Sequence, residues 1–257
     1  MIKNKKILWL SANLFGYELL KEAVKISKDN IRAIITLSNK TKTKMYDGVD
    51  RERWREFSIP VYEIEEINKE VGLLNSLNPD HIIMAGWRQI INEEILNLPK
   101  KGFIGFHPTL LPEGRGSAPI INTILLGLKK SGATMFYLTK RLDDGDIIGQ
   151  VKFDVRENDY AEDLYNKTIE AGKVLTKRFL PLVIKDKAPR IPQERNRTVY
   201  FPKRSIKDNE IKINKDSPEE IYKKIRAFSR PYEGAYMKLG NKKLIIWKAD
   251  FKNEKTK

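Results

Sequence analysis

The sequence predicts an α/β fold: a doubly wound, largely parallel sheet followed by a small extension that contains strands. Short apolar runs rich in β-branched residues, such as Ile31–Leu37, alternate with helical segments over the first hundred residues. Hydrophobic residues make up 40% of the 257 residues, which is enough for a packed core. After Ile184 the periodic pattern is lost, which indicates that a second, smaller unit follows.

Five strands are expected before His107, with helices between them. The strands are Lys6–Ala12, Ile31–Leu37, Pro60–Ile64, His81–Ala85 and Gly102–Phe106, and the helices are Gly16–Ser27, Ile67–Leu77 and Asn92–Leu98. The polar stretch Ser38–Asp50 is expected to be a loop. Ligands of doubly wound sheets bind beyond the carboxyl ends of the strands, where His107 and Gly86–Arg88 are expected to lie.

The rest of the first unit is expected to hold a structured loop, a helix, two strands and a long helix. Pro and Gly mark the loop from Pro108 to Pro119. The remaining elements are a helix at Ile120–Leu128, strands at Gly132–Leu138 and Ile147–Phe153 that can pair antiparallel, and a helix at Tyr160–Ile184.

The last quarter of the chain is expected to begin with a linker, residues 185–203, because that stretch has three prolines and no clear periodicity. Ser217 and Pro218 have the residue types of an N-cap and first position, so Ser217–Ser229 is expected to be helical. A hairpin is predicted from Tyr236–Leu239 and Leu244–Trp247, and the tail KNEKTK is expected to be disordered.

Composition excludes several kinds of site. The chain has no cysteine, so disulfides and thiolate chemistry are excluded. Two histidines, His81 and His107, make a metal site built on several histidines unlikely, and His81 is expected to be structural. No apolar stretch reaches the ~18 residues that suggest a membrane span. The N-terminal apolar run is broken by polar residues and Gly16, so we expect a cytoplasmic protein rather than a secreted one.

The positive charge is concentrated toward the C-terminus. The formal net charge is +15, and residues 185–257 contain 21 basic and 10 acidic residues, a net charge of +11. Such an excess suits a phosphate-bearing partner, but a lysine-rich solvated surface explains it equally well.

The segment from Gly102 to Asp146 holds the most specific pattern. His107 is followed by Leu110–Leu111–Pro112, Arg115–Gly116, Pro119, Gly127 and Gly132, and then by Asp143 and Gly145. This pattern resembles the folate-dependent formyltransferases, a family that includes methionyl-tRNA and sugar-nucleotide N-formyltransferases. Similar residues extend to about Ala249, and the resemblance implies a Rossmann-like formyltransferase sheet. It also implies a catalytic domain over residues 1–184, a linker over 185–203 and a truncated, barrel-like subdomain over 204–257.

The resemblance implies an enzyme that transfers a formyl group from 10-formyltetrahydrofolate to an amine. The resemblance implies that His107 and Asp143 are the catalytic residues. The Asp143 carboxylate can orient the His107 imidazole and take part in a proton relay. The implied folate-binding residues are Met84, Gly86, Trp87, Arg88 and Asp144. The implied acceptor-binding residues are Gly105, Arg115, Arg204 and Arg226, with Arg115 open to a second interpretation as a brace within its loop.

One position departs from the family. Gly105 stands where the family has a catalytic Asn that donates a hydrogen bond to the oxyanion, and losing one such donor can cost ~10²–10³ in rate. We expect Gly105 to leave room for a water, a backbone N–H or another side chain. Three interpretations stay open: an active enzyme with a substitute donor, an altered acceptor geometry, or an inactive binding relative.

Two acceptors are compatible with these residues. A nucleotide-linked amino sugar is the first, and methionyl-tRNA is the alternative. The basic C-terminal quarter favours tRNA, whereas the ~50 residues after Lys207 are fewer than the fuller barrel implied by the tRNA branch. A homodimer formed through the C-terminal hairpin is a further expectation.

Overall fold

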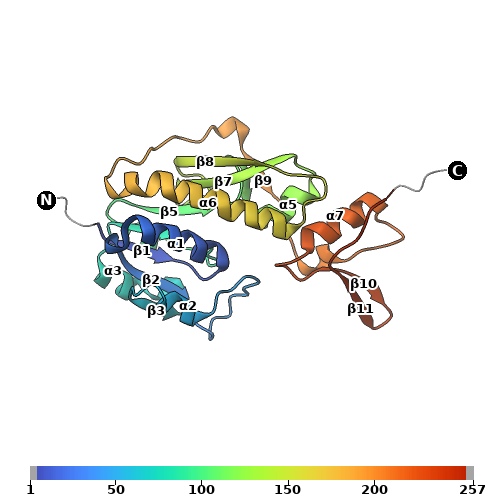
Figure 1. The fold of residues 1–257 in the computed structure, drawn as a ribbon, viewed down its shortest axis with the longest axis horizontal. Coiled ribbons are helices and arrows are strands. Elements are labelled where there is room, and N and C mark those ends of the chain that lie inside the picture. The colour runs from blue at the N-terminus through green and yellow to red at the C-terminus, as the bar shows by residue number, and fades with distance from the viewer. Residues whose placement is uncertain (1–4, 253–257) are drawn as a thin grey trace.

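The computed structural model describes residues 5–252, and the tail after Lys252 lies outside the described residues. A larger α/β part holds most of the chain, and a smaller part with α7, β10 and β11 lies beside it along the long axis (Figure 1). Within the described residues, no helix is both long and apolar enough to cross a membrane.

The larger part is built on a seven-stranded sheet of order β3-β2-β1-β4-β5-β7-β8. The first five strands in this order are parallel, and β7 and β8 are antiparallel to their neighbours, as the sequence predicted. The strands are β1 (Ile7–Leu10), β2 (Ile31–Leu37), β3 (Val61–Ile64), β4 (His81–Met84), β5 (Gly102–His107), β7 (Lys130–Tyr137) and β8 (Ile147–Asp154).

Helices cover both faces of this sheet. The α-helices are α1 (Leu14–Ser27), α2 (Arg51–Arg55), α3 (Val71–Leu77), α4 (Glu93–Leu96), α5 (Pro119–Leu125), α6 (Ala161–Ile184) and α7 (Pro218–Phe228). Short 3₁₀ helices lie at Lys28–Asn30, Ile67–Lys69, Arg195–Arg197 and Ile206–Asn209. The predicted helix Ile67–Leu77 is therefore divided into a 3₁₀ turn and α3.

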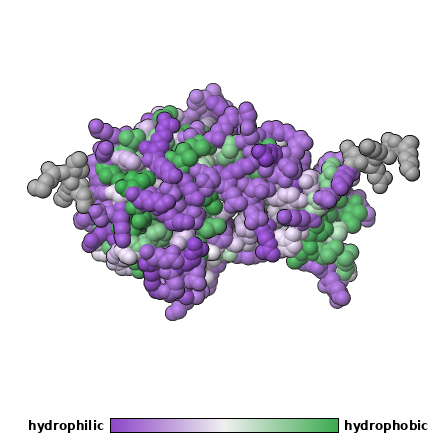
Figure 2. Space-filling model, in the orientation of Figure 1, coloured by the Kyte–Doolittle hydropathy of each residue, from purple (hydrophilic) through white to green (hydrophobic). Residues whose placement is uncertain are grey.

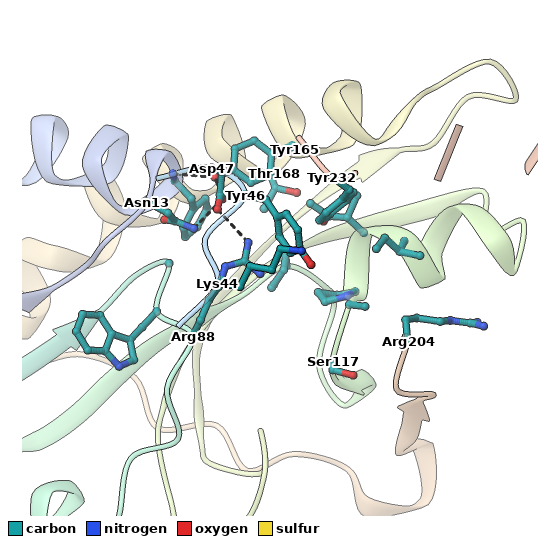
Figure 3. Close-up of a pocket in the computed structure, with 18 of the residues that line it drawn as sticks. Asn13, Lys44, Tyr46, Asp47, Arg88, Ser117, Tyr165, Thr168, Arg204 and Tyr232 are labelled. Carbon is teal, nitrogen blue, oxygen red and sulfur yellow. Dashed lines mark hydrogen bonds and ion pairs between the residues drawn. The ribbon is translucent and has the colours of Figure 1, made fainter. Parts of the chain in front are cut away.

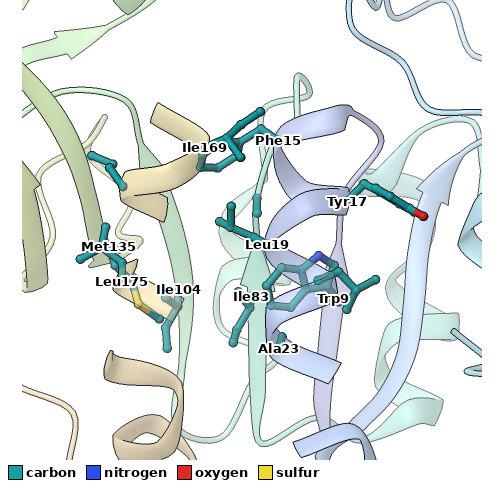
Figure 4. Packing of buried hydrophobic residues seen from close by; sticks show 14 of the residues in the cluster. Trp9, Phe15, Tyr17, Leu19, Ala23, Ile83, Ile104, Met135, Ile169 and Leu175 are labelled. Carbon is teal, nitrogen blue, oxygen red and sulfur yellow. The ribbon is translucent and has the colours of Figure 1, made fainter. Parts of the chain in front are cut away.

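The main core lies between the sheet and the α1–α6 pair. Alternate strand residues such as Trp9 and Ile83 face Leu19 of α1 and Leu175 of α6 (Figure 4). Their neighbours, such as Leu8 and Ile82, enter a second cluster with α3 and α4. This alternation explains why each strand reads as a continuous apolar run, because both faces of a covered parallel sheet are buried.

The smaller part follows the predicted pattern closely. Ser217 caps α7 by accepting a hydrogen bond from the backbone N–H of Glu220, and the Glu220 side chain accepts from the N–H of Ser217. Strands β10 (Ala235–Leu239) and β11 (Lys242–Ile246) form the expected hairpin. Hydrophobic residues gather over this part in Figure 2, and Leu239, Leu244 and Ile245 are about half exposed.

Two short strands were missed by the sequence analysis. β6 (Glu113–Gly116) lies inside the predicted loop and pairs in parallel with β9 (Val199–Phe201), inside the predicted linker. Strands of three or four residues next to Gly and Pro show no usable alternation, so the sequence signal was absent. The segment between the two parts is thus hydrogen-bonded to the loop that follows His107.

Candidate active site

A cavity of about 700 Å³ lies at the carboxyl edge of the parallel strands. It is lined by residues that follow β1, β2, β4 and β5, by the start of α5, by the first turns of α6 and by the C-terminal part. Four of the predicted site residues lie at the end of β4 or just after it and line the cavity: Met84, Gly86, Trp87 and Arg88. His107 lines it as well, and this is the edge at which the fold class places ligands.

His107 ends β5 and is 7% exposed. Its Nε2 lies 2.8 Å from the carbonyl oxygen of Gly114. Because a carbonyl oxygen only accepts, Nε2 carries the hydrogen and the lone pair of the neutral ring is on Nδ1. Nδ1 lies 3.7 Å from Oδ2 of Asp143. The nitrogen that can take up a proton therefore faces the carboxylate.

Asp143 is held by its backbone and by its carboxylate. Its φ is +51°, in the left-handed region that Asp tolerates better than most residues. Its Oδ2 accepts a hydrogen bond of 2.8 Å from the backbone N–H of Gly116. Gly145 is required nearby, because a Cβ there would lie 1.7 Å from the carbonyl oxygen of Tyr137. The loop after β7 thus aims one carboxylate oxygen at His107.

Arg115 and Asp144 do not line the cavity, contrary to the sequence-based expectation that they bind acceptor and folate. Arg115 is 3% exposed, and its Nη2 lies 2.6 Å from Oδ1 of Asp144. Arg115 also donates to Oε1 of Gln193 from Nε and Nη2. The two charged side chains pair with each other rather than with a ligand. This ion pair therefore stabilises the loop that contains Asp143.

The two C-terminal arginines lie in different surroundings. Arg204 lines the cavity and donates from Nε to Oδ1 of Asn122 over 2.7 Å. Arg226, contrary to expectation, does not reach the cavity. It is 7% exposed, donates to the carbonyl oxygen of Asp159 and lies over the ring of Tyr222. Burial lowers its pKa, and its partners lie on α7 and before α6.

Gly105 does not line the cavity, and the expected room beside it is absent. A Cβ at this position would lie 2.3 Å from Cδ1 of Leu138 and 3.5 Å from the ring of Phe136. Of the three expected occupants, a side chain fills the space, and this side chain, Leu138, has no hydrogen-bond donor.

An Asp47-centred network was missed by the sequence analysis. Asp47 is 8% exposed and accepts hydrogen bonds from Asn13 Nδ2 (2.8 Å), Arg88 Nη2 (2.9 Å) and the Tyr165 hydroxyl (Figure 3). Burial, followed by the nearby Asp47 carboxylate, raises the pKa of Tyr165, so the hydroxyl stays a donor. The sequence offered only an Asp-Gly pair in a polar loop, which is typical of a turn.

The same loop meets the C-terminal part at the mouth of the cavity. Lys44 forms an ion pair with Glu233, and the Tyr46 ring packs edge-on against Tyr232 with centroids 6.0 Å apart. The guanidinium of Arg88 also contacts this tyrosine pair, at 5.3 Å from the centroid of the Tyr46 ring. Arg204 and Ser117 lie in the lower right of Figure 3, below Tyr232. Within residues 5–252, no cluster of three acidic or histidine side chains could hold a metal ion.

Comparison with known proteins identifies the family. The formyl transferase family model matches residues 5–180, and the model of the formyl transferase C-terminal domain matches residues 205–257. The chain therefore belongs to the formyl transferase family.

The curated relatives are longer than this chain. The bifunctional polymyxin resistance protein ArnA of Wigglesworthia glossinidia brevipalpis is 32% identical over 254 residues, covering 98% of this chain and 39% of that protein. The methionyl-tRNA formyltransferase of Halalkalibacterium halodurans is 37% identical over 194 residues, covering 75% of this chain and 61% of that protein.

Solved structures share the fold. A 4-N formyltransferase from Francisella tularensis has a TM-score of 0.75 at 22% identity and covers 97% of this chain and 99% of its own. An N-formyltransferase from Helicobacter canadensis, solved in complex with folinic acid and dTDP-3-aminofucose, has a TM-score of 0.67 at 22% identity, covering 87% and 80%.

Proposed function

We propose that this chain is an N-formyltransferase that moves a formyl group from 10-formyltetrahydrofolate to an amine. The single observation that supports this most is the approach of the Asp143 carboxylate to His107, which lines the cavity at the carboxyl edge of the sheet. Formyl transfer needs a group that accepts a proton from the attacking amine and a charge that stabilises the resulting cation. Nδ1 of His107 and the carboxylate of Asp143 supply these two functions.

The folate co-substrate fits the residues after β4. The Trp87 indole N–H is a buried donor without a hydrogen-bond partner in the described part of the chain, and Trp87 lines the cavity beside Met84. Gly86 has φ +67°, which turns the chain into the cavity. Met84, Gly86, Trp87 and Arg88 would hold the folate, which supplies an activated formyl carbon when bound. The related Helicobacter structure was solved with folinic acid, which supports a folate co-substrate.

In the proposed mechanism, the amine nitrogen bonds to the formyl carbon, and His107 takes the amine proton at Nδ1 while Nε2 stays hydrogen-bonded to Gly114. Asp143 then faces an imidazolium across 3.7 Å, so the charge created in the step is stabilised where it forms. The Gly116 N–H holds the carboxylate during this change, because it donates to the same Oδ2. The bond between the formyl carbon and the folate nitrogen then breaks, and His107 returns the proton to that nitrogen. His107 is 7% exposed, which limits exchange of this proton with bulk water.

We propose a nucleotide-linked amino sugar as the acceptor. The cavity of about 700 Å³ is in the range of small-molecule sites, ~300–1,000 Å³, and the C-terminal part covers one side of it. Arg204 provides a cation for phosphate, and Tyr46 and Tyr232 provide aromatic surface for a base. The match to ArnA spans nearly the whole chain, and the Helicobacter relative was solved with an amino-sugar nucleotide. The homodimer expected from the hairpin stays a prediction.

Methionyl-tRNA is the second candidate acceptor. The methionyl-tRNA formyltransferase of Halalkalibacterium halodurans is the more identical of the two curated relatives described above, and residues 185–257 carry a net charge of +11. Binding through these charges would weaken steeply with salt, because phosphate contacts release counterions.

The test is a direct transfer assay with 10-formyltetrahydrofolate and two acceptors. A panel of nucleotide-linked amino sugars is compared with charged initiator tRNA across salt concentrations, and products are detected by mass. Formylation of a sugar nucleotide by wild type, and loss of it in His107→Gln, is the expected result. Formylation of tRNA alone would move the assignment to the second acceptor. No transfer to either acceptor would contradict the proposal and favour a binding relative without activity.

A further inference from the structure

Gln193 lies in the segment predicted as a linker, yet its side chain contacts the Asp143 loop. Its Nε2 donates to the carbonyl oxygen of Asp143 over 2.9 Å and to that of Gly145 over 2.8 Å. Its Oε1 accepts from Arg115 Nη2 over 2.7 Å and from Arg115 Nε over 3.2 Å. One amide therefore joins the backbone on both sides of Asp144 to a buried guanidinium.

Arg115 holds the same loop through the side chain of Asp144. Its Nη2 pairs with Oδ1 of Asp144 at 2.6 Å, while Gln193 holds the neighbouring carbonyl groups. Asp143 has φ +51°, a conformation that costs free energy for a residue with a side chain and persists only when its surroundings hold it. Gln193 and Arg115 provide that hold through the carbonyl oxygens of Asp143 and Gly145 and the carboxylate of Asp144.

The backbone around Gln193 is fixed without help from its side chain. Ile191 exchanges two backbone hydrogen bonds with Ile147, of 2.8 and 3.0 Å. Further along, β9 pairs with β6, which contains Arg115 itself. The backbone is therefore hydrogen-bonded to the rest of the fold on both sides of Gln193. Changing the Gln193 side chain should leave the path of the segment unchanged.

We propose that Gln193 is a positioning residue that sets the orientation of the Asp143 carboxylate toward His107. The proposal rests on the proposed function, since it gives the segment between the two parts a role in formyl transfer. Loss of the amide N–H donors frees the carbonyl groups of Asp143 and Gly145, so the loop no longer holds the left-handed conformation. The carboxylate then spends less time opposite Nδ1 of His107.

The kinetic test compares two substitutions with a matched control in the same segment. Gln193→Glu keeps the size and an acceptor for Arg115 but replaces the donor by an oxygen that repels both carbonyl groups. Gln193→Ala removes donor and acceptor. Glu194→Gln is the control, because Glu194 is exposed and its ion pair with Arg197 spans 3.9 Å. We expect kcat to fall about 10-fold or more in both variants while KM for either substrate changes less than about 3-fold, as for a loss confined to the transition state.

A second readout does not require activity. The chain has two histidines, so the ring signals of His107 and His81 can be followed separately by NMR. Displacing Asp143 should move the His107 signals in Gln193→Ala and Gln193→Glu and leave those of His81 unchanged. If wild type transfers no formyl group, the proposed function fails, while the NMR comparison still tests the position of Asp143. Unmoved His107 signals, or moved signals at both histidines with a lower melting temperature, would overturn the proposal.

Discussion

Leu138 occupies the space where a side chain on Gly105 would begin, with Cδ1 2.3 Å from the position of a Cβ atom. The two residues come from neighbouring elements, since Gly105 is in β5 and Leu138 follows β7. A side chain at position 105 can therefore enter only if Leu138 moves. An Asn at position 105 therefore requires a new side-chain conformation of Leu138, which is half-buried.

We predict that Gly105→Asn and Leu138→Ala are coupled. Gly105→Asn alone should reduce the free energy of unfolding by about 1–3 kcal/mol because it overpacks the site. In the double variant the smaller Ala gives the Asn room, so its destabilisation should be smaller than the sum of the two single variants. A double-mutant cycle from denaturant unfolding measures this difference. Additive effects would show that Leu138 does not restrict position 105.

Asp143 should be needed for the rate but not for the fold. In Asp143→Asn the side chain keeps its shape and an acceptor for the Gly116 N–H but loses the charge that faces His107. We expect kcat to fall about 10²–10³-fold with little change in melting temperature. Asp146→Asn is the control, since Asp146 belongs to the same loop and pairs only loosely with Arg190, at 4.0 Å. Equal losses in both variants would argue against a specific role for Asp143.

The Asp47 network should contribute measurably to stability. Asp47→Ala leaves Asn13 Nδ2 and the Tyr165 hydroxyl without their acceptor, and it removes the partner of Arg88. Leaving buried donors unpaired costs about 1–3 kcal/mol, which thermal or urea unfolding will detect. Glu65→Ala is the control, because Glu65 is exposed and accepts hydrogen bonds through its backbone carbonyl, which the substitution keeps. If Asp47→Ala lowers the free energy of unfolding no more than Glu65→Ala does, the Asp47 network does not contribute to stability.

His81 should make stability depend on pH. It is 2% exposed at the start of β4, and burial lowers its pKa despite Asp186 at 3.7 Å. Lys5 opposes the protonated form too, so the unfolded chain binds the proton more readily than the folded one. Stability conferred by neutral His81 is therefore complete above the unfolded pKa of ~6.5 and declines as the pH falls below it.

The check for His81 compares wild type with His81→Gln at two pH values. Between pH ~7.5 and pH ~5.5, on either side of the ordinary histidine pKa, the melting temperature of wild type should fall further than that of the variant. Parallel curves for the two proteins would show that His81 does not cause the acid sensitivity.

Much of the larger part could be predicted from sequence because its strands are buried on both faces. Runs such as Ile31–Leu37 are apolar and β-branched throughout, and the structure has a strand over the same residues. His107 and Asp143 could be named because a strand end and a fixed motif place them at the ligand edge of the fold. Their meeting at 3.7 Å could not be predicted from strand pairing, because β7 ends beside Ile104 and the loop that follows it must return toward His107, where Gly116 holds the Asp143 carboxylate.

The residues that sequence analysis missed or misplaced depend on contacts across the fold. Asp47 and Gln193 lie in segments without periodicity, and their partners are up to 118 residues away. Arg226 was expected to bind the acceptor, but it is buried and donates to the carbonyl oxygen of Asp159, before α6. Arg115 carried two interpretations, and only its pairing with Asp144 and Gln193 favours the brace.

The most direct test of the central claim is the single-turnover rate of formyl transfer in wild type, His107→Gln, Asp143→Asn and the double variant. Gln can still donate to the Gly114 carbonyl but cannot take a proton, so each single variant should be about 10²–10⁴-fold slower than wild type. Because the two residues act as one unit, the double variant should be little slower than the slower single variant. A wild-type rate in His107→Gln, with its melting temperature unchanged, would contradict the account.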